Sequence, residues 1–196
     1  MSIDLRAIIG LGNPGSEHAR QRHNAGFWFA DRVAAEFRGT FRKESRFQGQ
    51  LAEVTIAGHR VLLLEPMTYM NNSGHGVQAL MAFHKFTPDQ VLVAHDELDL
   101  PVGTVRLKLG GGHGGHNGLR SLHDCIGPDY RRLRIGIAHP GHKDLVHDYV
   151  LNKPSSEDRK VILESIDAAL AALPVLFEKG WEHAMNGLHA RKPDGN

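Results

Sequence analysis

Short apolar runs alternate with segments of helical periodicity along this 196-residue chain, and this alternation constrains the fold more than any other feature. Runs of strand length lie at 5–11, 51–56, 60–64, 91–94, 105–109 and 133–138. Between them, apolar residues recur every three or four positions, which predicts helices. Interleaved strands and helices pack in layers, so we expect an α/β fold. The expected architecture is a single domain with a twisted, mixed and mostly parallel sheet flanked by helices.

The long C-terminal helix has the clearest boundary signals. Ser155 and Asp158 have the spacing of a capping box, and the apolar periodicity continues to Phe177. Pro174 is expected to kink this helix, because proline lacks the N–H that the helix interior needs. Gly180 fits the end of the helix.

The composition favours one domain in a reducing compartment. At 41% hydrophobic residues and a net charge of +1, the chain can bury a core without being broadly basic. A single cysteine, Cys125, excludes an intramolecular disulfide. The sequence has no apolar run long enough for a transmembrane helix and no signal-peptide pattern, so we expect a cytoplasmic protein without a membrane partner. We place residues 1–190 in the domain and expect 191–196 to form a frayed polar tail.

The first apolar run ends in Gly10-Leu11-Gly12-Asn13-Pro14-Gly15, which has the spacing of a dinucleotide-binding fingerprint. Pro14 argues against that function, since it has no N–H to offer a phosphate. The helical periodicity also starts only at Ala25, and the acidic residues at the expected distance lie within it. We therefore interpret the glycines as a tight turn that presents Asn13 at the end of the strand.

Polar residues follow several of the predicted strands. Asn13 follows the first, Thr68–Gly74 the strand that ends near Glu65, His95 and Asp96 the 91–94 strand, and Gly110–Gly118 the 105–109 strand. Ligands of open α/β sheets bind beyond the carboxyl ends of the strands. We therefore expect these groups to converge on one site, with His23 nearby.

These residue types suit hydrolysis by water. His23 is the natural proton acceptor, because the pKa of imidazole lies near neutrality, and Asp96 could orient it. Cys125 lies in a helical pattern and no serine nucleophile motif is present, which favours water over a protein nucleophile. A metal-dependent hydrolase that uses His95, Asp96 and His113 remains an alternative. A third alternative is an RNA-binding protein without turnover, although the intact polar set disfavours it.

Six segments together resemble the bacterial peptidyl-tRNA hydrolase family. They are GLGNPG (10–15), RHNAG (22–26), TYMNNSG (68–74), AHDELDLPVG (94–103), KLGGGHGGHNGL (108–119) and RLRIGI (132–137). The resemblance covers nearly the whole chain. It implies a monomeric enzyme, without cofactor or metal, that cleaves the ester between a peptide and the 3′-terminal ribose of tRNA and so recycles the tRNA.

The resemblance also implies roles for individual residues. His23 matches the catalytic base and Asp96 the carboxylate that orients it. Asn13 matches the residue that separates N-blocked peptidyl esters from free aminoacyl-tRNA. These three positions are the expected catalytic group.

The other matched positions are implied to bind peptidyl-tRNA through its acceptor end and 5′-phosphate. Lys108 and Arg134 match a pair that grips the 5′-phosphate, while Asn71 and Asn117 match residues that hold the peptide, the tRNA end and the water. At His18 the family usually has tyrosine, so this tRNA contact departs from the pattern. The binding positions in chain order are His18, Tyr69, Met70, Asn71, Lys108, His116, Asn117 and Arg134.

A local excess of positive charge supports an RNA partner. Between residues 104 and 134 only Asp124 and Asp129 oppose six basic residues, which are Arg106, Lys108, Arg120, Arg131, Arg132 and Arg134. Lysine and arginine contacts to phosphates release counterions, so the binding should depend on salt. We expect this segment to form the RNA-facing surface.

Overall fold

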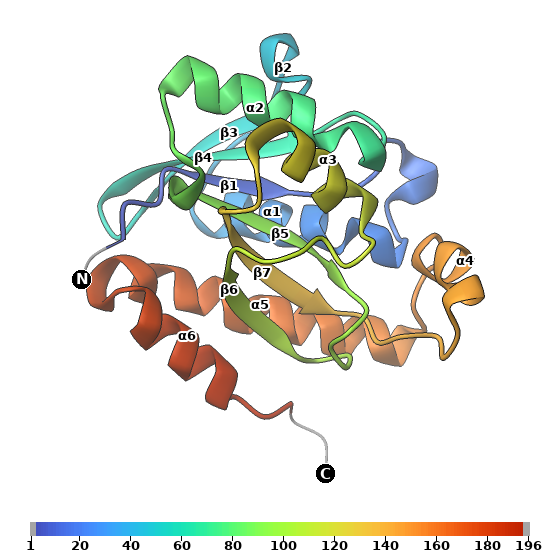
Figure 1. The fold of residues 1–196 in the computed structure, drawn as a ribbon. Helices are drawn as coiled ribbons and strands as arrows, with labels where there is room; N and C mark the ends of the chain where they lie inside the picture. Colours follow the sequence, from blue (N-terminus) through green and yellow to red (C-terminus); the bar gives the residue numbers. More distant parts are fainter. Residues whose placement is uncertain (1–2, 194–196) are drawn as a thin grey trace.

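The structure, a computed structural model, describes residues 3–193 and contains one seven-stranded sheet with helices on both faces (Figure 1). The strand order is β2-β3-β4-β1-β5-β7-β6. The four central strands β4, β1, β5 and β7 are parallel, whereas β2, β3 and β6 each pair antiparallel with a neighbour. The strands are β1 (Ala7–Gly10), β2 (Arg42–Glu44), β3 (Gly49–Ile56), β4 (His59–Pro66), β5 (Val91–Glu97), β6 (Val105–Leu109) and β7 (Arg131–Gly136).

Six α-helices surround the sheet within residues 3–193. They are α1 (Ala25–Glu36), α2 (Ser73–His84), α3 (Asn117–Ile126), α4 (Val146–Val150), α5 (Ser156–Lys179) and α6 (Trp181–Ala190). Short 3-10 helices occur at Ser16–His18, Arg22–Asn24, Ser45–Phe47, Met70–Asn72, Pro88–Gln90 and Lys143–Leu145. Residues 191–193 of the predicted tail follow α6, and 194–196 lie outside the described part of the chain.

The core has two layers because successive strand side chains point to opposite faces of the sheet. Ile8 of β1 packs into the layer beneath α1, α5 and α6, and the adjacent Ile9 packs into the layer beneath α2 and α3. Central strands covered on both faces need apolar residues at every position. This requirement explains the continuous apolar runs in β1 and β5.

Most of the predicted elements are confirmed, and the errors have physical causes. The 117–126 helix has the expected bounds, and Ser155 caps α5 by accepting from the Asp158 N–H at 3.1 Å. The α5 helix continues past Pro174 and ends before Gly180. Three elements have no clear signal in the sequence: β2, whose three residues are all charged, the five-residue helix α4, and α6, a short helix that packs on β6.

The expectation that β6 ends at the same edge as the central strands is wrong. Only seven residues, 98–104, join β5 to β6, which is too short for a parallel crossover. Strand β6 therefore runs antiparallel to β7, and its last residue, Leu109, pairs with Arg131 at the start of β7. The segment 110–116, called the glycine loop below, must run back to α3 (Figure 1).

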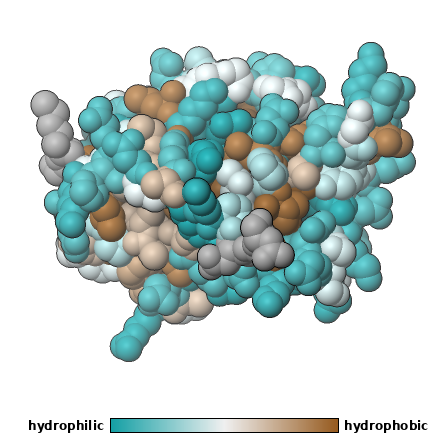
Figure 2. All heavy atoms as spheres, turned by 90° about the horizontal axis from the view of Figure 1, so that it is seen from below, coloured by the Kyte–Doolittle hydropathy of each residue, from teal (hydrophilic) through white to brown (hydrophobic). Residues whose placement is uncertain are grey.

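The surface seen from below mixes broad hydrophilic areas with small apolar patches (Figure 2). Among the described helices, none has both the length and the apolar character that crossing a bilayer requires.

Candidate active site

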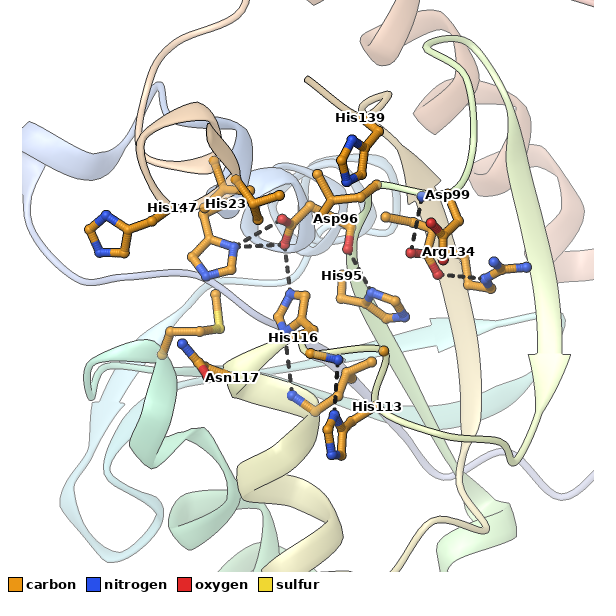
Figure 3. A pocket seen from close by; sticks show the side chains of 18 of the residues that line it. His23, His95, Asp96, Asp99, His113, His116, Asn117, Arg134, His139 and His147 are labelled. Carbon is orange, nitrogen blue, oxygen red and sulfur yellow. Dashed lines mark hydrogen bonds and ion pairs between the residues drawn. The ribbon is translucent and has the colours of Figure 1, made fainter. Parts of the chain in front are cut away.

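A cleft of about 880 Å³ opens at the edge of the sheet where β1, β4 and β5 end. Ten of the eleven predicted site residues line it (Figure 3). They are Asn13, His23, Tyr69, Met70, Asn71, Asp96, Lys108, His116, Asn117 and Arg134. The expectation that ligands bind beyond the carboxyl ends of the parallel strands therefore predicted the position of the site. The polar groups that follow β6 reach the cleft only because the glycine loop runs back toward it.

His18 is the predicted site residue that does not line this cleft. It ends a 3-10 helix, where its Nδ1 lies 2.9 Å from Oε1 of Gln21. Its other ring nitrogen lies 3.8 Å from a carboxylate oxygen of Glu17. The structure thus separates His18 from the other ten residues.

Close packing of backbone places the start of α1 beside the ends of β1 and β5. A Cβ at Gly26 would lie 2.3 Å from the carbonyl oxygen of Ala94 and 2.5 Å from the nitrogen of Leu11. Only glycine permits this approach. It brings His23, one turn earlier in the chain, against Asp96 at the end of β5.

Asn13 is held rigidly at the end of β1. Its backbone N–H donates to Oδ1 of Asn24 at 2.9 Å, and Nδ2 of Asn24 donates back to the Asn13 carbonyl at 3.0 Å. Oδ1 of Asn13 accepts from the backbone N–H of Met70 at 2.8 Å. This bond fixes the orientation of the Asn13 amide and leaves its Nδ2 donor for the cleft.

Asn24 is a site residue that the sequence analysis did not single out. It is buried, and its amide holds the Asn13 backbone through the two bonds just described. The only available signal was its place directly after His23 in the RHNAG segment.

His23 and Asp96 form a buried pair. Nδ1 of His23 lies 2.9 Å and 3.1 Å from the two carboxylate oxygens, and since a carboxylate only accepts, Nδ1 carries the proton. Burial lowers the pKa of His23, but the charge of Asp96 and its hydrogen bond outweigh burial and raise the pKa above 6.5. Burial opposes ionisation of Asp96 as well. The charges of His23 and His116 and their hydrogen bonds nevertheless hold the pKa of that carboxyl well below its usual range.

His116 links the glycine loop to this pair. Its Nδ1 accepts the backbone N–H groups of Gly118 at 3.1 Å and Leu119 at 3.3 Å, which caps α3. Because Nδ1 must then be unprotonated, the proton is on Nε2, which donates to Oδ1 of Asp96 at 2.8 Å. One imidazole therefore serves as both helix cap and partner of the carboxylate (Figure 3).

His95 and His113 do not join Asp96 in a metal site. His95 is fully buried, and its Nδ1 donates to the backbone carbonyl of Asp96 at 2.9 Å. Burial lowers the pKa of His95 to about 3. Nδ1 of His113 accepts from the N–H of Gly115 at 3.0 Å. The metal alternative based on these two histidines lacks the required geometry.

A different trio, His23, Asp96 and His116, places one ligand atom each within 4.8 Å of the others. Ligation through Nε2 of His116 would move its proton to Nδ1 and break both capping bonds to α3. The donor set therefore fits the hydrogen-bonded arrangement better than a metal ion.

The predicted RNA-facing charges are only partly on the surface. Lys108 is exposed, and Arg134 is half-buried with its Nε donating to Oε1 of Glu97 at 2.8 Å. Arg132, in contrast, is 2% exposed. The expectation that it belongs to the RNA-facing surface is wrong. Its hydrogen bonds to carbonyl groups of the chain replace those to water.

The family follows from the sequence as a whole. Residues 7–195 match the sequence model of the family described as Peptidyl-tRNA hydrolase. The chain belongs to the peptidyl-tRNA hydrolase family. It is 51% identical to a peptidyl-tRNA hydrolase from Halorhodospira halophila over 187 residues, which are 95% of this chain and 96% of the relative. It is 47% identical to one from Neisseria meningitidis serogroup B over 192 residues, 97% and 100% of the two chains.

A solved peptidyl-tRNA hydrolase agrees with this assignment. The crystal structure of the Acinetobacter baumannii peptidyl-tRNA hydrolase superposes with a TM-score of 0.95 at 47% identity, covering 98% of each chain. A purine nucleoside phosphorylase from Toxoplasma gondii has a TM-score of 0.54 at 9% identity and shares the fold alone.

In this member of the peptidyl-tRNA hydrolase family, apolar and aromatic side chains line two parts of the cleft. Tyr69, 64% exposed, stands beside buried Met70 on one side. Val146 and Val150 of α4, together with Leu98, line another part of the cleft. The cleft thus offers apolar surface close to the polar His23–Asp96 pair.

Proposed function

We propose that this chain hydrolyses peptidyl-tRNA with His23 as general base and water as nucleophile. The observation that carries the proposal is the state of His23. Asp96 holds its Nδ1 proton, and Nε2 is left as an acceptor for a molecule in the cleft. An imidazole in that tautomer can take a proton from water.

In the proposed reaction, Nε2 of His23 accepts a proton from water as the water oxygen bonds to the ester carbonyl carbon. The C–O bond to the ribose then breaks, and the proton on Nε2 passes to the ribose oxygen. The products are a free peptide carboxyl group and a tRNA with its terminal hydroxyl restored. The Asp96 carboxylate stabilises the transient imidazolium, and such positioned acid–base catalysis typically contributes about 10²–10⁴-fold.

Asn13 is proposed to select N-blocked substrates. Its Oδ1 is occupied by Met70, so the cleft meets the Nδ2 donor. A peptidyl ester has an amide carbonyl that can accept from this group, whereas the ammonium of an aminoacyl ester only donates. The fixed amide therefore favours a substrate whose amino group is already acylated.

The tRNA end is proposed to bind along the rest of the cleft. Lys108 and Arg134 supply positive charge for the 5′-phosphate, and Asn71, Asn117 and Tyr69 supply exposed polar and aromatic groups near the ester. All of these residues come from one chain, so we expect a monomer to be active. No step in this scheme uses a metal.

The direct test is release of a radiolabelled N-acetyl-aminoacyl group from tRNA by the purified protein. We expect release from the acetylated ester, at least tenfold slower release from the free aminoacyl ester, and no loss of activity after exhaustive chelation. Activity lost on chelation and restored by a divalent cation would support the metal alternative. Binding of tRNA without release would support the RNA-binding protein without turnover.

A further inference from the structure

Packing alone does not explain how the glycine loop keeps its position. A Cβ at Gly112, Gly114 or Gly115 would meet no described atom within 4 Å, so the loop stands clear of the body of the protein. Gly114 and Gly115 also have left-handed φ values of 58° and 82°. A segment of this kind has high conformational entropy, so it needs fixed points at its ends.

Arg132 supplies the fixed point at the start of the loop. Its two terminal nitrogens donate to the carbonyls of Gly112 and Gly111, each at 2.5 Å. The second nitrogen also lies 3.2 Å from the carbonyl of Pro128 and 3.1 Å from Nε2 of His123. One guanidinium therefore joins the start of the loop to the C-terminal end of α3.

His116 supplies the fixed point at the other end, through its bond to Asp96 and its cap on α3. The loop is thus suspended between Arg132 and the catalytic carboxylate. Arg132 lies in the wall of the cleft, but it is buried and stacked 4.6 Å from the ring of Tyr130. Its terminal nitrogens are already bonded to carbonyl groups of the chain.

We propose that Arg132 is a positioning residue that acts on the reaction through the glycine loop and His116. This inference rests on the proposed hydrolase function and goes beyond it, because it assigns a catalytic effect to a residue whose terminal nitrogens are bonded to the glycine loop. The planar fork of a guanidinium can hold several carbonyl groups in fixed directions, whereas a lysine ammonium of equal charge cannot. Loss of the fork should leave His116 misplaced relative to Asp96.

The experiment compares Arg132→Lys with Arg131→Lys. Both keep the charge. Arg131, which the basic segment predicted to be RNA-facing, does not line the cleft: at the start of β7 it donates to the carbonyl of Asp89 and lies 4.6 Å from the ring of Trp181. We expect Arg132→Lys to lower kcat by about 10- to 100-fold with KM changed less than threefold, since a displacement of about 1 Å can cost this much. Arg131→Lys should behave like the unmodified protein.

Three readouts separate positioning from a phosphate contact or from general destabilisation. A phosphate contact would raise KM and flatten the salt dependence of kcat/KM, which would overturn the proposal. Positioning through His116 predicts that Arg132→Lys and His116→Asn are non-additive in a double-mutant cycle. It also predicts that the acid limb of kcat/KM moves to higher pH in both variants, because Asp96 then keeps more of its charge for His23. Additive effects with an unmoved acid limb would indicate a merely structural role.

Amide hydrogen exchange tests the position of the glycine loop without a measurement of enzymatic activity. In Arg132→Lys, the amides of residues 112–118 should lose protection while β1 and β5 keep theirs, and in Arg131→Lys neither should change. If the unmodified protein proved inactive, the proposed function would fail but this result would still stand. Unchanged protection of these amides in Arg132→Lys would overturn the proposal that Arg132 holds the glycine loop in place.

If Arg132→Lys fails to fold, NMR of the arginine side chains in the unmodified protein distinguishes a positioning role of Arg132 from a contact with RNA. Restricted rotation of the Arg132 guanidinium, unaltered when tRNA is added, is the expected result. A shift or broadening of its signals on tRNA binding would instead identify an RNA contact and overturn the proposal.

Discussion

Two glycine-rich segments deliver polar groups to the same cleft by different physical means: the strand-end turn 10–15 places Asn13, and the glycine loop places His116. In the first, the glycines permit close packing, since a Cβ at Gly10 would lie 2.5 Å from the carbonyl oxygen of Gly26. In the glycine loop, the glycines at 112, 114 and 115 face open space. The first segment is fixed by what surrounds it and the second by hydrogen bonds at its two ends.

Because of this difference, one part of the site has a fixed geometry and the other part can change its position. The strand-end turn places Asn13 through a continuous core, so its geometry should survive changes of substrate. The glycine loop can move when either end bond is lost, because its contacts with the body of the protein are few, such as that of His113 with His123. We therefore expect mutations in the first segment to affect folding and mutations in the second to affect turnover.

The largest expected effect is the loss of turnover when the proposed base, His23, is removed. His23→Ala should lower kcat by about 10²–10⁴-fold, because the water then lacks a proton acceptor. Release of labelled N-acetyl-aminoacyl ester measures kcat, and tRNA binding together with circular dichroism controls for the fold. Turnover close to that of the unmodified protein would refute His23 as the base.

The Asp96→Asn variant tests the charge that His23 and His116 share. The base form of His23 is required, and its pKa is raised above 6.5, so the acid limb of kcat/KM should lie above pH 6.5. In Asp96→Asn the raising charge is gone while burial remains, so the limb should move below pH 6.5. We also expect kcat to fall by about 10²–10⁴-fold, because the base loses its orienting partner. A limb that stays in place would show that another group titrates.

A crossed pair of glycine substitutions tests the comparison itself. Gly26 of α1 is the residue against which the strand-end turn packs. Gly26→Ala would place a Cβ 2.5 Å from the nitrogen of Leu11 and 2.3 Å from the Ala94 carbonyl oxygen, and this overpacking should lower the free energy of unfolding by about 3 kcal/mol. Gly114→Ala has room but an unfavourable φ of 58°, so it should cost only about 1 kcal/mol. Its main effect should be a several-fold loss of kcat. Urea unfolding and steady-state kinetics on both variants would reveal the reverse pattern if the comparison is wrong.

The smallest expected effect concerns the exposed charge at the end of β6. Lys108→Gln should raise KM a few-fold and reduce the slope of log kcat/KM against log salt by about one, as expected when one phosphate contact is removed. Titration of activity from low to high potassium chloride measures the slope. An unchanged slope would place the tRNA phosphates elsewhere.

The sequence predicted the parts of this site that depend on parallel strand ends, because those ends meet at one edge wherever the sheet is parallel. Asn13 and Asp96 follow from that rule alone. It could not predict that β6 reverses direction, since pairing with β7 is a long-range choice made by a strand 26 residues downstream.

The role of Arg132 was equally hidden, because an arginine in a basic segment has the same sequence signal whether it faces solvent or carbonyl groups. Asn24 was missed because a polar residue next to a histidine suggests no particular partner. In both cases the side chain bonds to residues that are separated from it in the sequence, and only the folded chain brings the partners together.

His116 illustrates how one position can be limited to a single amino acid. It must accept two backbone N–H groups on one edge of its side chain and donate to Asp96 from the other. Asparagine is long enough for the cap but too short to reach the carboxylate as well, and glutamine or lysine cannot do both. The side chain of His113 accepts a single backbone N–H, that of Gly115, and has no carboxylate to reach. A library of all substitutions should therefore accept asparagine or aspartate at 113 and only histidine at 116.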